Sequence, residues 1–204
     1  MNKKLFIVAL FMILVFMSPV FAQALTYVIQ KGDTLWRIAV KNQVGVSELI
    51  SSNPQISNPN LIYPGQKITI PSITSTKALE TEVVRLVNVE RSKQGLMLLT
   101  ENWQLSRIAR YKSQDMINKS YFSHTSPTYG SPFQMIESFG IRFSAAGENI
   151  AYGQPTPQAV MVAWMNSPGH RANILSPSYT QIGVGLAKDA SGRCYWTQHF
   201  IKPY

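Results

Sequence analysis

A short polar segment divides this sequence into two parts, and this division constrains the fold more than any other feature. Residues 72–77 read Ser-Ile-Thr-Ser-Thr-Lys and follow directly on the apolar string Ile68-Thr-Ile-Pro71. The part after this segment is long enough to bury a core of its own, and a linker this short gives little reach. We therefore expect two modules, residues 25–71 and 78–204, joined by a linker at 72–77.

The N-terminus has the pattern of a secretory signal peptide. Lys3 and Lys4 precede an apolar run, residues 5–17, which is shorter than the ~18–20 residues needed to cross a bilayer. Small residues follow at cleavage spacing and predict cleavage after Ala22 or after Ala24. We expect residues 1–24 to be removed during secretion; an uncleaved membrane anchor is the alternative.

Composition narrows the class of partner. The 204 residues carry a formal net charge of +9, which favours anionic partners such as wall polymers, membrane surfaces or nucleic acids. Because the chain is expected to be exported, we expect no nucleic-acid partner. Cys194 is the single cysteine, so no intrachain disulfide can form and core packing must hold the exported chain together.

The first module has the pattern of a small β-α-α-β unit. Residues 25–30 are rich in β-branched and aromatic side chains and predict a strand. A turn follows, and Asp33 or Thr34 can cap the helix that starts there. A second short helix is expected over 46–50, and residues 67–70 predict a closing strand, antiparallel to the first. So small a unit, without an evident acid–base pair, is typical of a binding module.

Three strings in this module form a specific pattern. They are Tyr27-Val-Ile-Gln-Lys-Gly-Asp-Thr-Leu-Trp-Arg-Ile-Ala39, Leu49-Ile-Ser-Ser-Asn-Pro54 and Leu61-Ile-Tyr-Pro-Gly-Gln-Lys-Ile-Thr-Ile-Pro71. Together they resemble a LysM domain. The resemblance implies binding to glycans that contain N-acetylglucosamine, chiefly peptidoglycan or chitin, in a groove between the loop after the first strand and the loop before the second.

The resemblance gives this groove two walls. The wall residues are Gly32, Asp33, Thr34 and Leu35 on one side and Asn58, Pro59, Asn60, Leu61 and Ile62 on the other. Backbone amides and Asp or Asn side chains can hydrogen-bond acetamido groups, and Leu and Ile can cover the apolar sugar face. The alternative is that the first loop is only a turn and a helix cap. Trp36 is expected in the core rather than at the sugar, because it lies at helical spacing with Leu35 and Ala39.

The second module predicts an α+β fold with helices on a mostly antiparallel sheet. Helical spacing and N-terminal cap or proline signals predict helices over 78–94 and 104–118 and from Ser131, Pro157 and Ser167. Strand patterns are found at 148–152, 182–187 and 195–201, the last two joined by a hairpin. These elements predict a layered sandwich.

Three histidines and one glutamate are the candidates for chemistry in this module. His124, His170 and His199 are the histidines of the chain, and Glu148 lies between the first two. Two histidines and a carboxylate brought together could ligate a divalent metal or share a proton. Their spacing does not show convergence, so the residues alone leave open whether they share a site.

Several short motifs lie along residues 79–201. They are Asp115-Met116, Tyr121-Phe-Ser-His124, Gly147-Glu-Asn-Ile-Ala151, Trp164-Met-Asn-Ser-Pro-Gly-His-Arg-Ala-Asn-Ile-Leu175, Ile182-Gly-Val-Gly185 and Tyr195-Trp-Thr-Gln198. Together they resemble the bacterial branch of the CAP superfamily, which includes cysteine-rich secretory proteins, antigen 5 and pathogenesis-related proteins. The resemblance implies an α-β-α sandwich with a central cleft, lined in many members by two histidines and two acidic residues.

The resemblance also assigns roles. His124, Glu148 and His170 take three of the four cleft positions and are the candidate catalytic residues. Some family members bind zinc or another divalent ion through the histidines, so His124 and His170 are the candidate metal ligands. The fold class that follows for the chain is α+β, a small βααβ LysM module and then an α-β-α sandwich CAP domain.

The fourth cleft position departs from the family pattern. In many eukaryotic members an acidic residue lies three places after the helix tryptophan, but that place after Trp164 is Ser167 here. Glu137 is the nearest other acid by motif context, although no spacing supports it. A metalloprotease needs a general base as well as ligands, and with Glu148 orienting a histidine no further carboxylate is evident.

Three functions remain compatible with the sequence. The first is a secreted protein of the cell wall or spore envelope that binds peptidoglycan through LysM and uses its CAP cleft, without catalysis, to recognise a wall, protein or lipid ligand. The second is a metal-assisted hydrolase of wall peptides or secreted proteins that uses the histidines and Glu148 of the cleft. The third is a structural coat or wall component with an inert cleft. The absent fourth acid favours the first.

Overall fold

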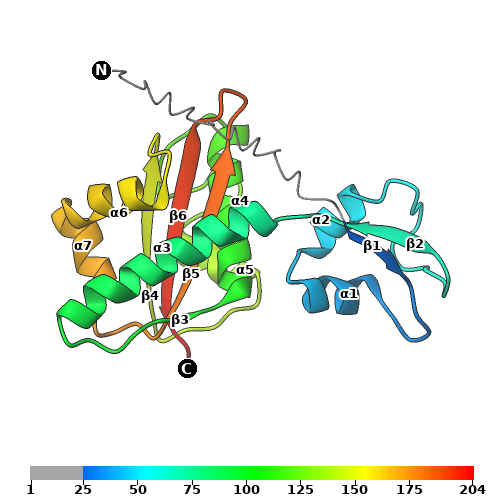
Figure 1. The fold of residues 1–204 in the computed structure, drawn as a ribbon, viewed down its shortest axis with the longest axis horizontal. Helices are drawn as coiled ribbons and strands as arrows, with labels where there is room; N and C mark the ends of the chain where they lie inside the picture. The colour runs from blue at the N-terminus through cyan, green and yellow to red at the C-terminus, as the bar shows by residue number, and fades with distance from the viewer. Residues whose placement is uncertain (1–24) are drawn as a thin grey trace, which may run out of the picture.

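The computed structural model describes residues 25–204, which form two modules joined by a short segment (Figure 1). The expected signal peptide, residues 1–24, lies outside the described residues. Within residues 25–204, no helix is both long enough and apolar enough to span a membrane.

The N-terminal module has the predicted β-α-α-β order. Its elements are β1 (Leu25–Val28), α1 (Leu35–Asn42), α2 (Val46–Ser51) and β2 (Lys67–Ile70). The two strands pair antiparallel, and Ile38 of α1 and Leu49 of α2 join Ile68 of β2 in a small core. Of the two expected caps for α1, Thr34 takes the role, because its Oγ1 accepts the backbone N–H of Arg37.

The expectation that Trp36 lies in the core is wrong. Its exposed fraction is 63%, whereas Leu35, Ile38 and Ala39 are buried. A short surface helix buries one stripe of side chains at spacings of three and four residues. Trp36 lies about 100° around the helix axis from Leu35, outside this stripe, so its spacing from Ala39 alone did not place it.

The C-terminal module is the predicted α+β sandwich. Its helices are α3 (Thr74–Lys93), α4 (Trp103–Asn118), α5 (Pro132–Ser138), α6 (Pro157–Met165) and α7 (Pro168–Ile174). Its strands are β3 (Thr100–Glu101), β4 (Ala145–Tyr152), β5 (Gln181–Lys188) and β6 (Cys194–Lys202). The strands form one sheet in the order β3-β5-β6-β4, in which only β3 and β5 are parallel.

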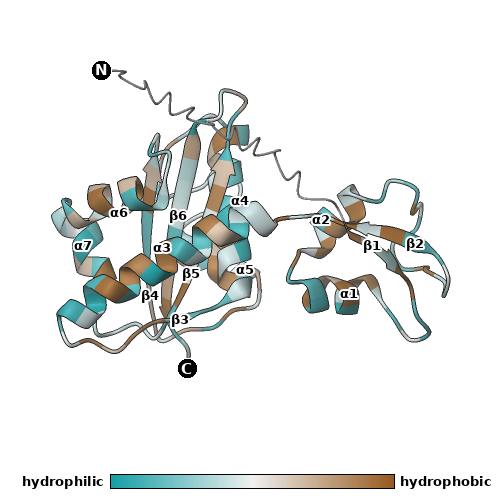
Figure 2. Cartoon of the chain, viewed as in Figure 1, coloured by the Kyte–Doolittle hydropathy of each residue, from teal (hydrophilic) through white to brown (hydrophobic). Residues whose placement is uncertain are grey.

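Helices cover both faces of this sheet (Figure 1). Helices α3, α6 and α7 lie on one face, around a core that includes Val87, Trp164 and Trp196. Helices α4 and α5 lie on the other face, around Leu105 and Ile136. Figure 2 shows apolar and polar stretches in alternation along α3, as expected for a helix with one side against the sheet.

Two glycines of β5 let α4 lie close to the sheet. Because successive side chains of a strand point to opposite faces, Val184 joins the core under α3 while Gly183 and Gly185 face α4. A Cβ at Gly185 would lie 2.0 Å from the backbone nitrogen of Arg110. Helix α4 therefore rests on β5 almost backbone to backbone, and this contact positions the loop after α4 that carries His124.

The first helix of the C-terminal module begins earlier than predicted. It starts at Thr74 rather than at residue 78, so residues 74–77 of the expected linker are helical. These small polar residues have the composition of a linker, but a long packed helix extends through them because each added residue gains one hydrogen bond. The modules also contact each other, since Lys77 donates to Gln43 and the Tyr111 hydroxyl donates to Glu48 of α2.

Candidate functional site

A buried carboxylate on the edge strand β4 joins two histidines. Glu148 on β4 and His199 on β6 are directly opposite each other in the antiparallel ladder. Nε2 of His199 lies 2.9 Å from Oε2 of Glu148, and Nδ1 of His124 lies 2.7 Å from Oε1. The structure thus brings together His124, Glu148 and His199, whereas the family resemblance assigned His124, Glu148 and His170 to the site and left His199 out.

One sequence signal could have drawn attention to His199. It lies between Trp196 and Phe200 in a strand that reads as buried, and a buried polar side chain needs a hydrogen-bonding partner. The sequence did not identify that partner, because Glu148 lies 51 residues earlier in a different strand. Only the register between β4 and β6 makes the two residues neighbours.

Glu148 is held in its ionised form. Burial disfavours the charge, but hydrogen bonds from His124 and His199 outweigh it and hold the pKa of Glu148 below its usual value. An ionised carboxylate only accepts, so the hydrogen-bond network assigns protons to Nδ1 of His124 and Nε2 of His199. In a neutral His124 ring, Nε2 then keeps its lone pair, on a side chain that is about half exposed.

His170 reaches the same region from the opposite helical layer. It lies in the first turn of α7, and its backbone carbonyl accepts a hydrogen bond from Nδ2 of Asn149, the residue after Glu148. Partial burial, together with the charge of His124, lowers the pKa of the His170 imidazole. No hydrogen bond or ion pair joins the His170 ring to His124 or Glu148 in the described part of the chain, so this ring remains able to bond to a ligand.

An amide network fixes α7 against β4. Nδ2 of Asn173 donates to the Glu148 carbonyl and to Oδ1 of Asn149, and Nδ2 of Asn149 donates to Oε1 of Gln198. Asn149 and Gln198 are fully buried, where satisfied polar networks specify one arrangement. These amides hold the backbone of the cleft and are not free for a ligand.

Two buried charges hold the loop that carries His124. Nζ of Lys112 on α4 donates to the His124 carbonyl at 2.7 Å. Asp115, one turn further along α4, accepts hydrogen bonds from three hydroxyls, those of Tyr121, Ser126 and Thr128. Burial opposes ionisation of Asp115, but these bonds hold its pKa below the usual value. Asp115 belongs to one of the family motifs of the sequence, whereas Lys112 belongs to none of them.

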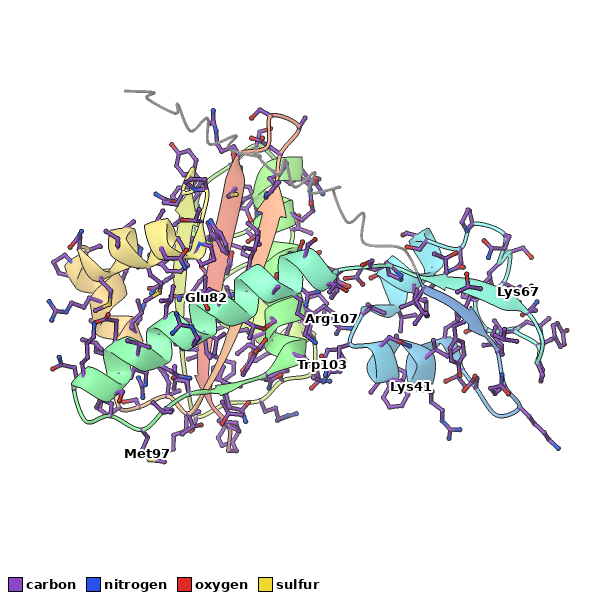
Figure 3. All side chains as sticks on the ribbon, viewed as in Figure 1. Lys41, Lys67, Glu82, Met97, Trp103 and Arg107 are labelled. Atoms are coloured by element: carbon purple, nitrogen blue, oxygen red, sulfur yellow. The ribbon has the colours of Figure 1, made fainter. Side chains whose placement is uncertain are left out.

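In the N-terminal module, strand pairing brings the two expected sugar-binding loops to one end. The Ile29 N–H donates to the Gln66 carbonyl, which closes the β1–β2 ladder between the loops. Figure 3 places Lys67, the first residue of β2, on the side of this module away from the C-terminal module. The loops at this end are therefore open to solvent.

The predicted wall residues differ in what they can offer a sugar. Oδ2 of Asp33 accepts from the Tyr27 hydroxyl and the Gln30 N–H, so this carboxylate shapes the first loop. Leu35 is buried in the core, which leaves only its backbone near the groove. The side chains or backbones of the remaining wall residues are at least partly exposed.

Comparison with known proteins assigns both modules. The family model of CAP, described as the cysteine-rich secretory protein family, matches residues 84–200. The chain belongs to the CAP family. The family model of the LysM domain matches residues 27–71, so the CAP domain of this protein follows an N-terminal LysM domain.

Three related proteins match parts of this chain. The uncharacterized protein YkwD of Bacillus subtilis (strain 168) is 56% identical over 133 residues, which are 65% of this chain and 51% of YkwD. The crystal structure of an extracellular protein containing a SCP domain from Bacillus anthracis str. Ames matches with a TM-score of 0.58 and 32% identity, over 68% of this chain and 47% of that one. The spore coat assembly protein ExsA of Bacillus cereus is 54% identical over 46 residues, 22% of this chain and 7% of ExsA.

The CAP domain has no carboxylate at the expected fourth position. Ser167 is the N-cap of α7. Glu137 lies exposed on α5 and makes no hydrogen bond or ion pair with His124 or His170 in the described part of the chain. Glu148 is thus the carboxylate that bonds to His124.

The donor set falls short of a catalytic zinc site. Within residues 25–204, no three His, Cys, Asp or Glu side chains are grouped so that they could hold a metal ion. Nε2 of His124 and the ring of His170 are two donors, and both oxygens of Glu148 already bond to imidazoles. Catalytic zinc sites have three protein ligands, so this donor set is one ligand short.

Proposed function

We propose that this protein is secreted and held at the cell wall or spore envelope by its LysM domain, where its CAP domain has a binding or regulatory role without catalysis. The LysM ligand is an N-acetylglucosamine glycan of peptidoglycan. The CAP cleft recognises a wall, protein or lipid ligand through the imidazoles of His124 and His170.

The LysM part of the proposal is supported by open loops with suitable chemistry. Asn58 and Asn60 are exposed polar residues, and Leu61 offers an apolar surface for a sugar face in the same loop. Even without Lys3 and Lys4 of the expected signal peptide, which contribute two positive charges to the formal net charge of +9, the chain remains basic, and this suits an anionic wall. The relation of this LysM domain to that of a spore coat assembly protein supports the spore envelope as one location.

The state of Glu148 is the observation that carries the CAP part of the proposal. A general base needs a lone pair directed at the proton it removes, but both oxygens of Glu148 accept from histidines inside the protein. Among the described residues, no serine, threonine or cysteine hydrogen-bonds the His124 ring, so the pair lacks an adjacent nucleophile. Glu148 therefore orients two imidazoles, which suits recognition of a ligand better than catalysis.

The test of the CAP role uses purified sacculi and residues 25–204. We expect the protein to sediment with the sacculi and to release no new muropeptides, as measured by mass spectrometry with and without added zinc. The variant His170→Ala should give the same fragment profile. Zinc-dependent fragments that His170→Ala does not release would instead establish a metal-assisted hydrolase.

The test of the LysM role uses two leucines of similar exposure. Leu61, in the predicted groove, is 52% exposed, and Leu98, in the CAP domain, is 59% exposed. We expect Leu61→Ala to reduce sedimentation with sacculi and Leu98→Ala to leave it unchanged. Equal sedimentation of both variants and the wild type would argue against the proposed groove.

A further inference from the structure

Three aromatic rings form a partly exposed row on the CAP domain. The ring centroids of Phe122 and Tyr152 are 4.7 Å apart, and those of Tyr152 and Tyr195 are 5.8 Å apart in a stacked arrangement. Phe122 and Tyr152 are each 46% exposed. Burying such rings stabilises a protein by a few kcal/mol, so a row left half open is a candidate ligand surface. We call these three residues the aromatic row.

The aromatic row borders a cavity that also has polar groups. The cavity has a volume of about 460 Å³ and is lined in addition by Ser120 and Asp189. Oδ1 of Asp189 accepts from the backbone and hydroxyl of Ser191 and from the Arg193 N–H. No donor to Oδ2 of Asp189 is found among the described residues, so this oxygen remains able to accept from a ligand.

The backbone of Ser120, which lines this cavity, has an uncommon conformation. Ser120 has φ 52°, in the left-handed region, and follows the last turn of α4, where the Tyr121 N–H donates to the Met116 carbonyl. Glycine is the usual residue at this position after a helix, and other residues are less stable there. The serine places a hydroxyl at the cavity, next to Tyr121 and Phe122.

The aromatic row continues the cleft along the same sheet ladder. Tyr152 and Tyr195 are directly opposite each other, and Glu148 lies on the same face of β4 four residues before Tyr152. At about 3.3 Å per residue, the row begins about 13 Å from Glu148. Phe122 lies two residues before His124 in the loop after α4. An extended ligand on the row would therefore run toward the imidazoles of the cleft.

We propose that the aromatic row binds a sugar ring of an N-acetylglucosamine glycan, as a second glycan site of this chain. The apolar C–H face of a pyranose packs on the aromatic faces, and its hydroxyl or acetamido N–H donates to Oδ2 of Asp189. A fully apolar ligand would cover Oδ2 of Asp189 without giving it a hydrogen-bond donor. The choice of glycan rests on the function proposed above for the LysM domain, because one polymer would then occupy both domains and bind with avidity.

The experiment titrates residues 25–204 with the tetramer of N-acetylglucosamine in a calorimeter. The double substitution Phe122→Leu/Tyr152→Leu keeps apolar volume and removes the aromatic faces. The matched control is Phe133→Leu, because Phe133 on α5 is 47% exposed and lies 6.3 Å from another ring, that of Phe143. Thermal unfolding of each variant shows that it is folded.

We expect two binding events for the wild type and for Phe133→Leu, and one for the double variant. The variant Leu61→Ala should weaken the other event by roughly tenfold, which corresponds to about 1.4 kcal/mol. If the double variant keeps both events, the aromatic row is not a glycan site, while the LysM function stands. If the double variant keeps both glycan events but, in a parallel titration, loses binding to a stem peptide of the wall, the proposal is overturned in favour of a peptide site. If the wild type shows no binding event that Leu61→Ala weakens, the function proposed for the LysM domain is overturned.

Discussion

Oε2 of Glu148 and Nε2 of His199 lie 2.9 Å apart, and both side chains are almost completely buried. Nδ1 of His199 has no hydrogen-bonding partner within residues 25–204. Because Glu148 is ionised and can only accept, Nε2 of His199 donates to it. The pair fixes the carboxylate so that its other oxygen meets His124 at the surface.

Removing either histidine should have very different effects on stability. His199→Ala leaves a buried carboxylate oxygen without its donor and should lower the free energy of unfolding by about 3 kcal/mol. His124→Ala removes a donor from the same carboxylate, but water can replace it at this exposed position, so a loss of about 1 kcal/mol is expected. Urea unfolding of both variants at neutral pH measures the difference. Equal losses would contradict the assignment of His199 as the buried positioning residue.

The close approach of α4 to β5 predicts a strong effect at Gly185. A Cβ there would lie 2.0 Å from the backbone nitrogen of Arg110 and 2.1 Å from the backbone carbon of Ala109. Because backbone atoms cannot turn aside as a side chain can, Gly185→Ala should lower the free energy of unfolding by about 3 kcal/mol. The matched control is Gly169→Ala, since no atom lies within 4 Å of a Cβ at that helical position. A Gly185→Ala variant as stable as this control would mean that α4 does not rest on the glycines.

Sequence reasoning succeeded where the determining contacts are local. The predicted start of α5 is confirmed, since Ser131 caps it and Pro132 is its first residue. The side chain of Ser131 accepts the Gln134 N–H and the Gln134 side chain accepts the Ser131 N–H, a contact between residues three apart. Such a cap depends on no other part of the chain, so its pattern is sufficient to predict it.

Sequence reasoning fell short where the determining contacts are distant. The pairing of Glu148 with His199 depends on the register of two strands, which hydrophobic alternation does not specify between particular residues. The exposure of Phe122 is a similar case, because aromatic side chains are usually buried and only the arrangement of loops and strands leaves this one open. The cleft could therefore be predicted in its motifs but not in its hydrogen bonds.

The contact between the two domains predicts how readily a protease cleaves the segment that joins them. The Tyr111 hydroxyl on α4 donates to Oε2 of Glu48 on α2, and burial with this hydrogen bond raises the pKa of Tyr111 to about 12. Tyr111→Phe removes this hydrogen bond, and that between the Tyr111 hydroxyl and Ser47 of α2, without changing the ring. We expect faster proteolytic cleavage near Pro71–Ile73, by about fivefold for a loss of about 1 kcal/mol. Tyr129→Phe is the control, because its hydroxyl bonds to no group in the described residues; equal cleavage rates would argue against a stabilising contact between the domains.

A buried carboxylate under α3 predicts how stability depends on pH. Oε1 of Glu80 accepts the Leu186 N–H from β5, and Arg110 of α4 lies 3.1 Å from the same oxygen. Burial outweighs these contacts and raises the pKa of Glu80 to about 7 from the ordinary value of 4.5. The folded pKa is the higher one, so the stabilisation is fully present below the unfolded value and is lost as the pH rises through about 7.

Substitution of Glu80 by glutamine isolates this contribution. Glutamine accepts the same N–H but does not ionise, so the stability of Glu80→Gln relative to the wild type should rise by about 3 kcal/mol between pH ~4.5 and pH ~8. Urea unfolding of both proteins across this range gives the difference. Glu82→Gln on α3 is the control, because the hydrogen bond from Arg85 lowers the pKa of Glu82, so this substitution should not gain stability relative to the wild type as the pH rises. Parallel stability curves for Glu80→Gln and the wild type would show that Arg110 and the Leu186 N–H compensate for burial, so that the pKa of Glu80 is the same in the folded and unfolded states.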